Sequence, residues 1–124
     1  MYKEAITALL VLFTAPAPAM AEGDIKKGKK VFKKCKACHS LTEGKNKVGP
    51  SMFDLIGSNS GAVEGYKYSD AMLAANLTWD EATLKEFLRK PKELVPKTKM
   101  AFGGLKKEKQ IDDLFAYLQS VAEK

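Results

Sequence analysis

Apolar residues at helical spacing predict helices at both ends of the folded part of the chain. Asp24 can cap a first helix, whose apolar positions recur every three or four residues. These positions are Ile25, Gly28, Val31, Phe32 and Cys35. A last helix is predicted over residues 106–123, with one continuous apolar stripe. The stripe comprises Ile111, Leu114, Phe115, Leu118, Val121 and Ala122, with Asp112, Asp113, Gln119 and Glu123 largely off it.

Glycines interrupt the middle of the chain. Residues 40–65 contain five of them, too closely spaced for regular structure. Ser69 can cap a short helix that runs to residue 76. The sequence Thr78-Trp79-Asp80-Glu81 resembles a capping box that opens a helix, which Pro91 would stop. From there to residue 104 we expect a loop.

No segment alternates with period two, so the pattern predicts an all-α fold. Gly28 lies on the apolar face of the first helix, where a missing side chain lets another helix cross closely. The last helix, which carries Phe115 and Tyr117, is the expected partner.

The first 21 residues read as a secretory leader. An uncharged, mostly apolar run of 11 residues, from Ala5 to Ala15, precedes a small-x-small triplet that ends at Ala21. A membrane span needs about 20 residues, so we predict a signal peptide, residues 1–21, that is cleaved rather than an anchor. This leaves 124 − 21 = 103 residues, a single domain over residues 22–124. A two-domain enzyme is thereby excluded.

The chain contains one histidine and two cysteines, which are too few for a typical structural zinc site or for several disulfides. All three lie in Cys35-Lys36-Ala37-Cys38-His39, the C-x-x-C-H attachment signature of c-type haem. Residues i and i+3 of a helix lie one turn apart, so both thiols can add to the vinyl groups of one haem. His39 would then meet the iron.

Two other uses of the cysteines predict different surroundings for them. A redox dithiol sits at a helix N-terminus after a strand, where the helix dipole lowers the thiol pKa. Cys35 and Cys38 are instead predicted at the end of a helix, with no βαβ pattern around them. A structural disulfide would leave His39 as an ordinary surface residue.

Residues 23–124 resemble the small class I cytochromes c, in particular cytochrome c2 and mitochondrial cytochrome c. The resemblance rests on several motifs in the family's order and spacing: the segment 23–32, C-K-A-C-H at 35–39, Gly49-Pro50, Gly65-Tyr66-Lys67-Tyr68, Thr78-Trp79 and 96–100. It implies four to five helices around one covalently bound haem c, with the N- and C-terminal helices crossing.

The second axial ligand of the iron cannot be histidine, because there is only one. Without the leader, Met52, Met72, Met100, a lysine or an open position remain. Met72 lies in a helical stretch and suits core packing. Met100 lies in a loop held off helical geometry by Pro96, Gly103 and Gly104, and the resemblance points to the same residue.

Ligation by His39 and Met100 closes both axial positions and favours one-electron exchange over catalysis. We therefore expect a soluble, non-enzymatic electron shuttle in the periplasm of a Gram-negative bacterium. The net charge is +6, and all basic residues except Arg89 are lysine. Hydrated ammonium groups suit brief docking more than tight binding. The lysines predicted to dock are Lys33, Lys34, Lys36, Lys47, Lys92, Lys97, Lys99 and Lys106.

The expected partners are acidic faces of redox proteins, such as a bc1 complex, a terminal oxidase, a photosynthetic reaction centre or a periplasmic dehydrogenase. A monomer that meets membrane complexes transiently, without inserting, is expected. Nucleic-acid binding is disfavoured, because the lysines lack interleaved aromatic residues. Two other functions stay open: a haem peroxidase or ligand-binding protein with a labile Met100, and a haem-free dithiol oxidoreductase.

Further roles are implied by the resemblance alone. Pro50 would accept a hydrogen bond from the ring N–H of His39, Tyr68, Trp79 and Thr98 would contact the haem propionates, and Phe32, Leu114 and Tyr117 would join the terminal helices. The chain departs from the family at four positions, namely Ser58, Met72, Phe87 and Lys97, where relatives often have arginine, asparagine, tyrosine and glycine. These departures predict a less hydrogen-bonded haem pocket.

Overall fold

The fold was analysed in a computed structural model that describes residues 9–11 and 23–122. The helices are α1 (Ile25–Lys36), α2 (Asp70–Ala74), α3 (Glu81–Arg89), α4 (Pro91–Leu94) and α5 (Glu108–Ala122). Strands are absent from the described residues, where only an isolated bridge joins Asn59 to Thr78. The predicted all-α class is therefore confirmed.

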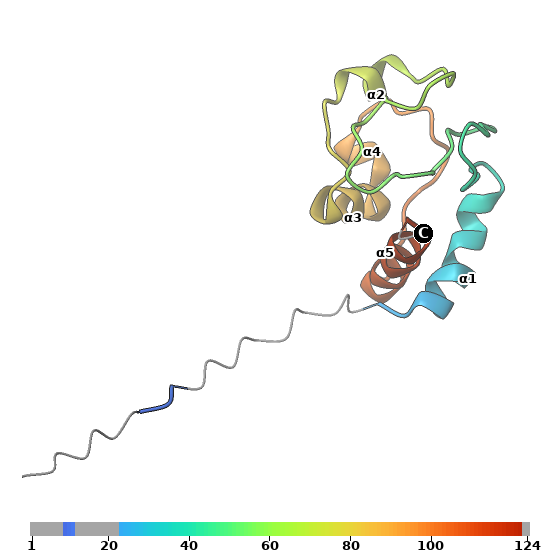
Figure 1. The fold of residues 1–124 in the computed structure, drawn as a ribbon. Coiled ribbons are helices and arrows are strands. Elements are labelled where there is room, and N and C mark those ends of the chain that lie inside the picture. The colour runs from blue at the N-terminus through green and yellow to red at the C-terminus, as the bar shows by residue number, and fades with distance from the viewer. Residues whose placement is uncertain (1–8, 12–22, 123–124) are drawn as a thin grey trace, which may run out of the picture.

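Helices α1 and α5 lie side by side, and α3 packs against α5 (Figure 1). Gly28 permits the first contact, because a Cβ added there would lie 1.9 Å from the carbonyl oxygen of Asp113. Next to it, the rings of Phe32 and Tyr117 are 5.5 Å apart, and Leu114 is fully buried. The predicted crossing of the terminal helices is confirmed at the residues expected to form it.

Side-chain caps determine where the helices begin. Asp24 caps α1 by accepting the N–H of Lys27 at 3.0 Å, and Ser69 caps α2 by accepting the N–H of Met72 at 3.1 Å, as predicted. The predicted capping box is wrong in its first residue. Asp80 is the residue that caps α3. Thr78 cannot do so, because it pairs in extended conformation with Asn59 and the buried Trp79 lies between it and the helix.

Other predicted boundaries also need correction. Pro91 does follow the end of α3, but the segment after it is not all loop: Pro91 opens α4, since proline suits the first position of a helix. Helix α2 ends at Ala74 rather than Asn76, whose φ of 49° is left-handed. Helix α5 starts at Glu108 rather than Lys106, and its predicted end at Glu123 lies outside the described residues.

Two residues have a different burial from the one predicted. Ile25 is 52% exposed, although Asp24 before it and Gly28 after it both contact α5. Asp113, expected off the apolar stripe, is only 3% exposed. Its carboxylate accepts the backbone N–H of Asp24 at 2.7 Å and a hydrogen bond from the Lys109 ammonium at 2.8 Å, which compensate for its burial.

The core lies between α1, α3 and α5, and the loop after α4 contributes to it. Val95, Leu105, Ile111 and Leu114 are almost completely buried there. Two ion pairs also join α3 to α5: Lys85 with Asp112, and Arg89 with Glu108. Of the predicted leader only residues 9–11 are described, and they are exposed. Within the described residues, no helix has the length and apolar character needed to cross a bilayer.

Candidate functional site

Cys35 and Cys38 lie at the C-terminal end of α1. The N–H groups of Cys38 and His39 both donate to the carbonyl of Cys35, at 3.1 and 2.9 Å, so the chain keeps turning beyond the last helical residue. The two thiols are therefore about one turn apart, as predicted, and they form no disulfide with each other.

The thiol of Cys35 has a raised pKa. Burial raises it to about 11, and the neighbouring Cys38 adds to the effect. A redox dithiol requires the opposite shift, since its attacking thiol must ionise near neutral pH. The environment of Cys35 thus disfavours this residue as the attacking thiol of a redox pair.

His39 is held by the segment that contains Gly49 and Pro50. Its Nδ1 lies 2.7 Å from the carbonyl oxygen of Pro50. A carbonyl can only accept, so Nδ1 carries the proton and Nε2 of the neutral ring keeps a lone pair. A Cβ added to Gly49 would lie 2.3 Å from the ring, so only glycine permits this approach. The contact places the imidazole as the predicted ligand requires.

Three methionines are partly buried against the core, so burial does not distinguish them. Met72 is part of α2, as predicted. The N–H of Met52 donates to Ser40 at 2.8 Å, which ties Met52 to the residue after His39. Met100 comes from a different part of the chain, a loop between Val95 and Leu105, whose ends are both buried. Of the three, Met100 is on a loop that is anchored at both ends independently of His39.

The predicted propionate contacts are spread over three segments. The Tyr68 hydroxyl accepts the N–H of Val63 at 2.9 Å and can still donate its own hydrogen. Burial raises the pKa of Tyr68, which keeps that hydrogen in place. Trp79 is 7% exposed and packs against Phe87 with ring centres 4.9 Å apart. Thr98 Oγ1 lies 3.4 Å from the N–H of Met100.

The departures from the family have local explanations. Phe87 fills the core beside Trp79, and the Ser58 hydroxyl donates to Leu55 at 2.6 Å. Lys97 has a φ of 66°, in the left-handed region that favours glycine, the residue that the resemblance led us to expect there. Lys97 therefore strains the loop that carries Met100.

All the lysines predicted to dock are exposed. Six of them make neither an ion pair nor a side-chain hydrogen bond with any described residue: Lys33, Lys34, Lys36, Lys92, Lys97 and Lys106. Two make contacts within the chain. The ammonium of Lys47 donates to the carbonyl of Lys36 at 2.7 Å, and that of Lys99 donates to the carbonyl of Lys67.

Sequence patterns missed two polar residues that shape the histidine side of the site. The Asn46 side chain accepts the N–H of Ser51 at 2.9 Å and donates to Glu64 at 3.1 Å. The buried Ser51 hydroxyl donates to Thr42 at 2.6 Å. An asparagine among glycines is a signal for such a side-chain-to-backbone turn, although it does not reveal the distant acceptor.

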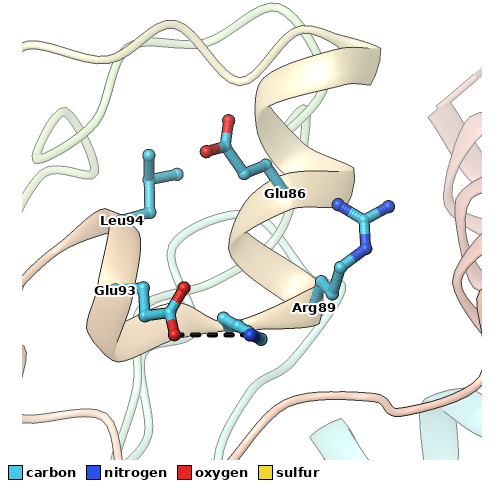
Figure 2. Close-up of a pocket in the computed structure, with 5 residues that line it drawn as sticks. Glu86, Arg89, Glu93 and Leu94 are labelled. Atoms are coloured by element: carbon cyan, nitrogen blue, oxygen red, sulfur yellow. Dashed lines mark ion pairs between the residues drawn. The ribbon is translucent and has the colours of Figure 1, made fainter.

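A cavity of about 230 Å³ at the junction of α3 and α4 lies outside this site. Figure 2 shows Glu86, Arg89, Glu93 and Leu94 around it, with an ion pair between Lys90 and Glu93 at 3.4 Å. None of these residues is among those predicted to bind the haem.

The donor set fits a haem c. Two unpaired thiols and an oriented imidazole lie within five consecutive residues. Partly buried apolar side chains lie around the core, among them Leu41, Met52, Leu55, Ile56, Leu77, Leu94, Met100 and Phe102. A flat apolar group placed against such side chains would bury part of the apolar surface that they still expose.

Known proteins resemble this chain over most of its length. The cytochrome c family matches residues 25–122. Cytochrome c-550 of Nitrobacter winogradskyi is 54% identical over 97 residues, covering 77% of this chain and 89% of that protein. Cytochrome c2 of Blastochloris viridis is 44% identical over 118 residues, covering 94% and 92%.

The fold has a close counterpart among solved structures. Cytochrome cH from Methylobacterium extorquens superposes with a TM-score of 0.74 at 45% identity, covering 79% of this chain and 99% of that one. Sequence, fold and donor set therefore agree, and the chain belongs to the cytochrome c family of electron carriers, whose cofactor is one covalently bound haem c.

Proposed function

We propose that this protein is an exported one-electron carrier that moves between membrane redox complexes in the periplasm of a Gram-negative bacterium. Cys35 and Cys38 hold the haem, and His39 and Met100 are its axial ligands. The observation that carries the proposal is the 2.7 Å contact from His39 Nδ1 to Pro50, which directs the lone pair to Nε2.

When bound, the haem supplies an iron that exchanges one electron between its ferrous and ferric states. The chain's residues keep the ligand set constant during that exchange. Pro50 and Gly49 maintain one tautomer and one ring plane of His39. The loop anchored at Val95 and Leu105 presents the thioether of Met100, a soft ligand that favours the ferrous state.

Tyr68, Trp79 and Thr98 would stabilise the charged haem propionates by donating hydrogen bonds, in keeping with the partly or fully buried positions of these side chains. Exposed lysines without intramolecular ion pairs steer the carrier to acidic faces of its partners. The carrier acts as a monomer that meets its partners transiently.

Absorption spectra of protein made in a host that attaches haem test this ligand set. Ferric wild type should show the weak long-wavelength band of iron bound to a thioether, and Met100→Ala should lose it. Met52→Leu and Met72→Leu are the matched controls and should keep the band. Loss of the band in either control, or its persistence in Met100→Ala, would contradict the assignment. A wild-type protein with an open iron would instead favour the peroxidase alternative.

Stopped-flow transfer to an acidic redox partner tests the docking role. The rate should fall as ionic strength rises, because salt screens the lysines. Lys92→Gln with Lys106→Gln should lower both the rate at low salt and its dependence on salt. A rate independent of ionic strength would refute electrostatic steering.

A further inference from the structure

Tyr66 contacts two separate segments of the chain at once. Its hydroxyl donates to the carbonyl of Val48 at 2.7 Å. The ammonium of Lys99 lies over the face of the Tyr66 ring, 4.6 Å from the ring centre. Tyr68 packs edge-on against the same ring, at a distance of 4.9 Å between centres, and so fixes its plane.

The first of these segments orients His39. Val48 lies beside Gly49 and Pro50, and the N–H of Gly49 donates to Cys38 at 2.7 Å. Lys47, on the other side of Val48, donates through its ammonium to the carbonyl of Lys36 at the end of α1. The Tyr66 hydroxyl is therefore attached to a segment that is held against the C-x-x-C-H motif by three hydrogen bonds, including that of His39 with Pro50.

The second segment carries Met100. Lys99 directly precedes Met100, and its ammonium is held by the Tyr66 ring and by the carbonyl of Lys67. A cation over an aromatic face and a charged hydrogen bond each contribute modestly, yet both act on one ammonium group and hold it in place. The segment 66–68 thus supports the loop that carries Met100.

We infer that Tyr66 and Lys99 form a bridge that couples the segment orienting His39 to the segment carrying Met100. Both are positioning residues for the two sides of the haem site, a statement that rests on the proposed ligand set. Because its ammonium is engaged inside the chain, Lys99 acts in supporting Met100 and not in docking. Lys97, two residues away, has no such partner among the described residues.

Lys99→Met tests the Met100 side, with Lys97→Met as the matched control. In ferric haem-loaded protein, the thioether band is followed through a guanidinium titration. At a fixed denaturant concentration, the equilibrium constant for loss of the band should rise about tenfold in Lys99→Met. It should change less than twofold in Lys97→Met. In Lys99→Arg, which keeps the positive charge, the equilibrium constant should stay close to the wild-type value. Equal behaviour of Lys99→Met and Lys97→Met would overturn the bridge.

Amide hydrogen exchange of the haem-loaded protein tests both sides without reference to the iron. Tyr66→Phe keeps the ring and removes the hydroxyl, so exchange should accelerate at Gly49 and not at Met100. Tyr66→Leu should accelerate exchange at both. Exchange in Tyr66→Leu that matches wild type at either segment would overturn the coupling.

The two experiments also separate this inference from the proposed function. A wild-type protein without the thioether band would refute ligation by Met100, and the bridge would then stand or fall on the exchange pattern alone. A wild-type protein with the band, but with Tyr66→Leu exchanging as wild type, would refute the bridge and leave the ligand set intact.

Discussion

The helical side and the loop side of this protein are held together by different means. On the helical side, α1, α3 and α5 interlock through buried side chains, and a bare Gly28 lets two backbones touch. On the loop side, residues 37–69 and 95–107 contribute few fully buried side chains and are held mainly by backbone and side-chain hydrogen bonds. The helical side therefore has a small side-chain core, to which the loop side adds only a few residues such as Val95 and Leu105.

Removal of the haem attachment should give the largest effect. Cys35→Ala combined with Cys38→Ala leaves the loop side without the group around which it packs, and a chain of this size has little core to spare. We expect most native helical content to be lost, measured by circular dichroism against haem-loaded wild type. Retention of native helicity in the double variant would show that the helical core is sufficient without haem, and would contradict this prediction.

Gly28→Ala should have the second-largest effect, a loss of stability on the helical side. The added Cβ would lie 1.9 Å from the Asp113 carbonyl, so α1 and α5 must separate. We expect Gly28→Ala to lower the free energy of unfolding by about 3 kcal/mol. Gly103→Ala is the control, because nothing lies within 4 Å of a Cβ added there. Similar losses in the two variants would refute the close-contact explanation, and denaturant titration measures both.

The buried Asp113 carboxylate should give the helical side a pH dependence. Burial alone would raise its pKa, but hydrogen bonds from the Asp24 N–H and the Lys109 ammonium outweigh it, and the pKa is lowered from 3.8. A lowered folded-state pKa stabilises the protein above about pH 4, and the contribution disappears as pH falls through the folded value.

Asp113→Asn should therefore cost about 1–2 kcal/mol at pH 7 and progressively less in acid. Thermal unfolding from pH 7 to pH 3 measures the difference, with the exposed Glu43→Gln as control. A difference between Asp113→Asn and wild type that stayed constant with pH would exclude the carboxylate as its source.

The smallest expected effect lies on the loop side and is stabilising. Lys97 has a left-handed φ of 66°, which glycine adopts without steric cost. Lys97→Gly should raise the free energy of unfolding by about 0.5–1 kcal/mol, since relieved strain exceeds the added flexibility of the unfolded chain. Lys97→Ala separates strain from charge: it removes the ammonium, keeps the Cβ, and should bring no gain.

The two sides also differ in how far sequence patterns predict them. On the helical side, apolar spacing identified α1 and α5, and Gly28 identified their crossing. Asp113 was mispredicted there because a polar residue on a helix looks exposed until its distant partners are known. On the loop side, glycines indicated irregular structure but not its path, and so the role of Tyr66 went unseen.

The amino-acid sequence alone determined the all-α class, the terminal helices and the family, because helical periodicity and the C-x-x-C-H motif are local patterns that neighbouring residues define. Only the tertiary structure decided three longer-range contacts. The ring of His39 hydrogen-bonds the carbonyl of Pro50, the Asp113 carboxylate accepts the backbone N–H of Asp24, and the Lys99 ammonium lies over the ring of Tyr66. Each of these contacts joins residues 11 or more positions apart, and their partners are selected by how the whole chain packs.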